Sequence, residues 1–131
     1  MTKRTIPVAV LIASSGVALG CLSSRTGPSD NVAGRCDVPL TAAFPGSTVV
    51  VIRNFGFSPA EVQVAAGGKV TWINCDVAGQ PAHTSTGDQG QWDTGSLLPG
   101  ESRTEIFVQA GRFDYHCEPH PFMKGAVVVE P

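Results

Sequence analysis

Short apolar stretches with a strand-like alternation recur through most of the chain. In residues 69–75 the alternation places Val70 and Trp72 on one face and Thr71 and Ile73 on the other. Other β-branched or alternating runs occupy residues 48–55, 102–108, 113–117 and 125–130. Glycine- and proline-containing turns separate the runs at residues 65–68, 98–101 and 110–112. No stretch of ten or more residues has a helical apolar period, so the pattern predicts an all-β fold, an antiparallel β-sandwich or barrel of about seven or eight strands.

The first residues follow a different pattern. Lys3 and Arg4 precede an apolar run over residues 6–19 that is short for a membrane span and ends in small residues. We interpret residues 1–20 as a signal peptide that is cut before Cys21. A buried helix is the alternative, but proline, serines and glycine within the run disfavour it.

Two kinds of export signal fit this cleavage point. The sequence VALGC resembles a bacterial lipoprotein signal, in which Cys21 would be lipidated. An ordinary signal peptidase could instead cut after Ala18-Leu19-Gly20. We favour lipidation, because a free N-terminal thiol is a liability in an oxidising compartment. Residues 21–35 are rich in small and polar residues and are interpreted as a flexible tether before a domain over residues 36–131.

Net charge excludes one class of partner. The whole chain has a formal net charge of −2. Loss of Lys3 and Arg4 leaves seven basic and eleven acidic side chains, a net charge of −4. Binding to nucleic acid requires clustered lysine and arginine, which are missing here, so we expect no nucleic-acid partner.

The four cysteines can be assigned different roles. Cys21 lies at the predicted cleavage site, and Cys117 lies in a segment with two histidines and a methionine. Cys36 and Cys75 remain, and an exported chain permits a disulfide between them. Two unrelated buried thiols are the alternative, since counting does not establish connectivity.

Residues 113–125 hold most of the potential soft metal ligands. Alternation along the predicted strand points Tyr115 and Cys117 toward the core and His116 away from it. Cys117, His120 and Met123 follow in the spacing C-x2-H-x2-M, which lets a turn bring three side chains together.

One histidine, His83, lies outside this segment. A thiolate, two imidazoles and a thioether suit copper that cycles between two oxidation states. Each residue alone is more often a packing or surface residue, so the prediction depends on their combination.

The sequence YHCEPHPFMKGAVVVE, residues 115–130, resembles the C-terminal signature of the small blue copper proteins. These are the cupredoxins of the plastocyanin, pseudoazurin and amicyanin class, and the short loop is most similar to that of amicyanin. The resemblance extends back to about residue 47, and it includes FSPAEVQVAAGGKVTWINCD and WDTGSLLPGES but neither Cys36 nor the tether. It implies a Greek-key β-sandwich and a single copper ion.

The resemblance also implies the ligands. His83, Cys117 and His120 would be the strong equatorial ligands and Met123 the weak axial one. The family usually has asparagine after the first histidine, whereas this chain has Thr84 and then Ser85. Either residue could replace the asparagine in joining the ligand loops.

We therefore expect a non-enzymatic electron carrier that uses Cu(I) and Cu(II). Four protein ligands leave no open position for a substrate. His120 would be the electron exit, surrounded by Pro119, Pro121 and Phe122, where redox partners dock transiently. The expected location is the periplasm or cell envelope, and the expected state is a monomer.

Three other functions or metals are compatible with parts of this pattern. The principal alternative is copper storage or delivery without electron shuttling. A zinc site is disfavoured by the methionine ligand. A copper oxidase or reductase is disfavoured by the small number of histidines, three in all.

Overall fold

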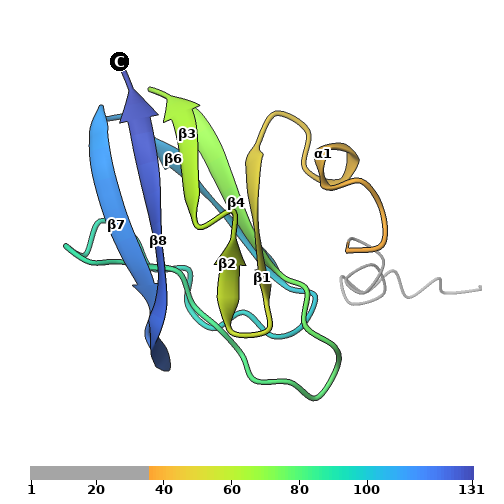
Figure 1. Cartoon of the computed structure of the whole chain (residues 1–131). Coiled ribbons are helices and arrows are strands. Elements are labelled where there is room, and N and C mark those ends of the chain that lie inside the picture. Colours follow the sequence, from red (N-terminus) through yellow and green to blue (C-terminus); the bar gives the residue numbers. More distant parts are fainter. Residues whose placement is uncertain (1–35) are drawn as a thin grey trace, which may run out of the picture.

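Two four-stranded sheets face each other in the computed structural model, which describes residues 36–131 (Figure 1). One sheet has the order β2-β1-β4-β6 and the other the order β3-β8-β7-β5. The strands of the first sheet are β1 (Thr48–Arg53), β2 (Gly56–Ser58), β4 (Gly68–Asn74) and β6 (Ser102–Phe107). The strands of the second are β3 (Glu61–Ala65), β5 (Thr86–Gly87), β7 (Gly111–Cys117) and β8 (His120–Glu130). The predicted all-β sandwich of about eight strands is confirmed.

Strand direction differs from the antiparallel expectation in two places. β1 pairs in parallel with β4, and β3 pairs in parallel with β8. The chain moves from the first sheet to the second for β3 and returns for β4, which brings strands of the same direction side by side. Apolar alternation predicts which face of a strand is buried, but it carries no information on the neighbouring strand.

Strand β4 is buried on both faces. The alternation along residues 69–75 had predicted how its side chains divide between the two faces, but not that both faces are covered. Every residue from Val70 to Asn74 is buried. The segment over residues 36–47, which includes the short helix α1 (Leu40–Ala43), lies against the outer side of this sheet (Figure 1). The Ser47 and Thr71 hydroxyls are 2.7 Å apart. A disulfide joins Cys36 to Cys75, with the two Cα atoms 5.8 Å apart, so this predicted pairing is confirmed.

Aromatic side chains fill the space between the sheets. Trp72 stacks on Trp92, with ring centroids 5.7 Å apart, and meets Tyr115 edge-on at 5.4 Å. Phe107 packs against both tryptophans. Burial raises the pKa of Tyr115 to about 12, so its hydroxyl stays neutral in the core. These rings belong to one buried cluster, and Tyr115 brings that cluster to within two residues of Cys117 at the end of β7.

The predicted signal peptide, Cys21 and the tether lie outside the described residues. Within residues 36–131, no helix has the length and apolar character needed to cross a bilayer.

Candidate metal centre

Cys117 and His120 are the closing pair of a tight hairpin. Cys117 is the last residue of β7, His120 is the first of β8, and the two are register partners. Met123 therefore lies within β8 rather than in the loop that the spacing suggested, and it is buried in the same apolar cluster as Cys117.

The predicted facing of β7 is confirmed. Tyr115 and Cys117 are buried, while Asp114 is exposed. A register shift follows His116, whose ring nitrogens face the carboxylates of Asp88 and Glu118 at 2.6 and 3.3 Å. His116 is thus directed away from the thiol, as alternation predicted.

His83 reaches the same place from the connection between β4 and β5. The N–H of His83 donates a hydrogen bond of 3.1 Å to the carbonyl of Leu97, and the N–H of Leu97 donates one of 2.8 Å to the carbonyl of His83. Its side chain is fully buried. Burial lowers the pKa of His83, and the carboxylate of Asp76 opposes that shift.

Three potential ligand atoms converge at this end of the sandwich. The Cys117 Sγ atom lies 3.6 Å from Nδ1 of His83 and 3.6 Å from Nδ1 of His120. All three atoms lie within 4.8 Å of one another. Bonds from a first-row metal to nitrogen or sulfur are about 2.0–2.3 Å long, so a single ion can contact all three. A thiolate with two imidazoles in an enclosed site fits one copper ion.

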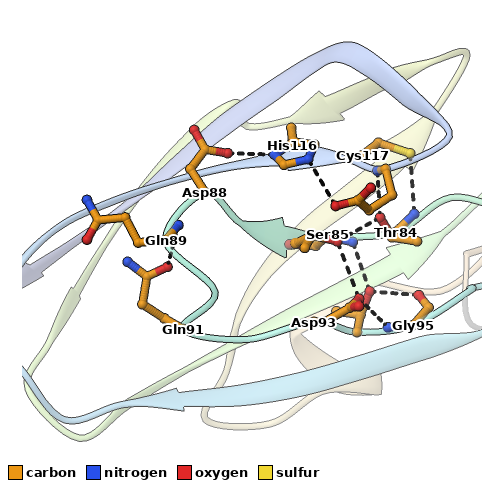
Figure 2. A network of polar contacts seen from close by, with 12 residues as sticks. Thr84, Ser85, Asp88, Gln89, Gln91, Asp93, Gly95, His116 and Cys117 are labelled. Carbon is orange, nitrogen blue, oxygen red and sulfur yellow. Dashed lines mark hydrogen bonds and ion pairs between the residues drawn. The ribbon is translucent and has the colours of Figure 1, made fainter.

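Thr84 joins the two ligand-bearing segments. Its backbone N–H points at the Cys117 sulfur, 3.3 Å away, and its hydroxyl accepts a hydrogen bond of 2.9 Å from the N–H of Glu118 (Figure 2). Ser85 is directed elsewhere, since its N–H donates to Thr94 and its hydroxyl accepts from the Trp92 indole. Of the two residues considered for the missing asparagine, Thr84 makes the link between the loops.

Two neighbours of the histidines were missed by the sequence analysis. Asp76 Oδ2 lies 3.1 Å from Nε2 of His83. Phe55 meets the rings of His83 and His120 edge-on, with centroids 5.5 and 4.9 Å away. Neither residue belongs to a ligand motif, and the one available signal for Asp76 was an acidic residue directly after a buried strand.

The predicted exit patch lies around His120 on the surface. Pro119, Pro121 and Phe122 are exposed, and His120 itself is partly exposed. The Phe122 side chain is 70% exposed, and its ring lies 6.1 Å from that of His120. Phe55, 43% exposed, extends the same apolar surface.

A two-sheet sandwich with a buried cysteine between two histidines at one end is the architecture of a cupredoxin. The family described as copper binding proteins, plastocyanin/azurin family, matches residues 46–130. The chain belongs to this family.

Within the family, the chain resembles amicyanin. It is 33% identical over 118 residues to amicyanin from Paracoccus denitrificans, which covers 84% of this chain and 90% of the relative. Amicyanin-alpha from Methylorubrum extorquens is 40% identical over 87 residues, 65% of this chain and 73% of the relative. Plastocyanin from Scenedesmus fuscus is 36% identical over 87 residues, 56% and 86% of the two chains.

Solved structures share the fold of this chain. A reduced amicyanin variant superposes with a TM-score of 0.57 at 34% identity, covering 66% of this chain and 84% of its own. A purple cupredoxin from Nitrosopumilus maritimus, 23% identical, shares the fold with a TM-score of 0.57 over 64% of this chain and 100% of its own.

Proposed function

We propose that the protein carries single electrons between redox partners by means of one bound copper ion. The observation that carries the proposal is the buried Cys117 sulfur, 3.6 Å from Nδ1 of both His83 and His120. Those three residues would be the strong ligands, and Met123, buried in the same cluster, would be a weaker fourth ligand. When bound, copper supplies a reversible one-electron couple.

The enclosure of the site favours electron transfer over catalysis. His83, Cys117 and Met123 are buried and His120 is partly exposed, so protein side chains cover most of the position that the ligand atoms surround. The Thr84 N–H donates to the Cys117 sulfur, and the Thr84 hydroxyl accepts from the N–H of Glu118. Together with the hairpin pairing of Cys117 with His120, these hydrogen bonds hold the proposed ligands in place. A rigid ligand set reduces the rearrangement that accompanies a change in oxidation state.

His120 is the proposed route for the electron. It is the one of the three close ligand residues whose side chain reaches the surface, and the exit patch of Pro119, Pro121 and Phe122 surrounds it. An apolar patch of this kind suits brief docking, because redox encounters bury little area. The amicyanin and plastocyanin relatives support this type of partner.

The proposed location is outside the cytoplasm. A signal peptide over residues 1–20 would export the chain, and the Cys36–Cys75 disulfide is a bond that persists in an oxidising compartment. Lipidation of Cys21, with residues 22–35 as a tether, would anchor a monomeric domain at the cell envelope.

A visible spectrum tests the function. Addition of Cu(II) to the purified mature protein should give an intense blue colour that disappears on reduction and returns on oxidation. Cys117→Ser should lose the colour while the far-UV spectrum of the sandwich is retained. A protein that binds one equivalent of copper without colour would instead indicate storage or delivery.

A further inference from the structure

The carboxylate of Asp76 lies between the buried ligand histidine and the turn that follows β1. Its side chain is 6% exposed. One oxygen, Oδ2, is 3.1 Å from Nε2 of His83, and the other, Oδ1, accepts a hydrogen bond of 2.8 Å from the backbone N–H of Asn54. Both oxygens of a nearly buried carboxylate are therefore occupied by groups from two different segments.

Asp76 is itself held firmly at the end of β4. Its backbone N–H donates to the side-chain oxygen of Asn74 at 3.0 Å. The preceding residue, Cys75, is bonded to Cys36, and its carbonyl accepts a hydrogen bond of 2.9 Å from Nε of Arg53. These contacts fix the backbone from which the carboxylate projects.

We propose that Asp76 is the positioning residue of the metal centre, which sets the tautomer and ring orientation of His83 and holds the turn that places Phe55 over both histidines. The inference rests on the copper site proposed above, since His83 matters here as a ligand. It concerns a residue that no ligand motif includes.

The hydrogen-bonding capacity of the Asp76 carboxylate determines the tautomer of His83. A neutral imidazole carries one N–H, and an ionised carboxylate only accepts hydrogen bonds. The contact with Asp76 therefore places the proton of His83 on Nε2. Nδ1, which faces the Cys117 sulfur at 3.6 Å, keeps its lone pair free for a metal.

The turn between β1 and β2 has an unusual backbone conformation. Asn54 and Phe55 both have positive φ, 51° and 57°, between the paired residues Arg53 and Gly56. This conformation suits Asn-Gly, whereas a bulky aromatic rarely adopts it. The hydrogen bond from Asn54 to Asp76 helps to hold this strained turn, and the turn sets the Phe55 ring edge-on to His83 and His120.

The first test needs no copper and no variant. The ¹⁵N chemical shifts of the His83 ring in the metal-free mature protein at neutral pH report which nitrogen carries the proton. We expect the proton on Nε2. A proton found on Nδ1 of the wild-type ring would overturn the proposal.

The second test uses Asp76→Asn. The amide of this variant has one acceptor oxygen, whereas both Nε2–H of His83 and the N–H of Asn54 need an acceptor. We expect His83 to populate the Nδ1–H tautomer, the copper affinity to fall about 10- to 100-fold, and the copper potential to rise because a negative charge beside the ligand is lost. Asp76→Glu should restore the Nε2–H tautomer. Asp114→Asn, which removes an exposed carboxylate from β7, is the matched charge control and should change neither tautomer nor affinity.

The outcomes separate the two proposals. If Asp76→Asn keeps the wild-type tautomer and copper affinity, Asp76 has no positioning role. If wild-type protein shows the expected tautomer but gives no blue colour with copper, the electron-carrier function fails and the structural role of Asp76 stands.

Discussion

The hydroxyl of Thr84 accepts a hydrogen bond from the backbone N–H of Glu118 at 2.9 Å, and it thereby bonds the residue after His83 to the residue after Cys117. The same threonine also directs its own N–H at the Cys117 sulfur. One residue thus connects two ligand segments that lie 34 positions apart in the sequence.

Thr84→Val keeps the shape of the side chain and removes the acceptor. The Glu118 N–H then loses its partner, so the free energy of unfolding of the metal-free protein should fall by about 1–3 kcal/mol in urea titrations. Copper should also be lost to a chelator faster than from wild type. Thr84→Ser, which keeps the hydroxyl, is the control, and equal stability of the two variants would show that the link contributes nothing.

Loss of the disulfide should destabilise the domain. The bond between Cys36 and Cys75 spans 39 positions and restricts the unfolded chain. Cys36→Ala should lower the free energy of unfolding by about 2–5 kcal/mol under non-reducing conditions. Wild-type protein in the presence of a reductant should show the same decrease, while the variant should be insensitive to the reductant.

Gly125 in β8 has no room for a side chain. A Cβ atom there would collide with the ring and hydroxyl of Tyr115 and would come within 2.8 Å of the Ala60 carbonyl. Gly125→Ala should therefore cost about 1–3 kcal/mol in thermal or urea unfolding. Gly56→Ala is the matched control, since a Cβ at that position meets nothing closer than 3.6 Å.

His116 should make stability depend on pH in the metal-free protein. The Asp88 carboxylate, 2.6 Å away, raises the pKa of His116 above its usual value, with a smaller contribution from Glu118. The folded state then holds a proton that the unfolded state releases near pH 6.5. This stabilisation is complete below about pH 6.5 and is lost as the pH rises through the folded-state pKa.

Unfolding measured between pH 6 and 9 checks this effect. Asp88→Asn should flatten the decline, whereas Asp114→Asn, which removes a carboxylate bound to Arg112, should leave it unchanged. An identical pH dependence in wild type and Asp88→Asn would contradict the assignment.

Much of the site could be predicted from local sequence. Alternation along 113–117 gave the burial of Cys117 and the outward direction of His116, because side chains of a strand alternate between its faces. The spacing of His120 three residues after Cys117 predicted an imidazole beside the thiol. The pairing of His83 with this hairpin came from a combination of residue types and the family resemblance rather than from any local rule.

The features that the sequence did not predict depend on contacts between segments that are distant in the sequence. Asp76 contacts His83 only because the chain just after β4 lies next to the turn that follows β1. Phe55 occupies a turn position for which sequence rules favour glycine, so its location could not be anticipated. Parallel pairing of β1 with β4 was missed for the same reason, since strand alternation does not specify a partner.

The long sequence separation between His83 and Cys117 has a consequence for the resistance of the protein to proteolysis. The Cys36–Cys75 bond is a covalent crosslink over 39 positions, and an ion shared by His83 and Cys117 would be a second, removable crosslink over 34. Closing a stretch of that length restricts the unfolded chain, so digestion by a protease should slow when copper is supplied. The abundance of the protein would then follow the availability of its metal even if its synthesis stayed constant.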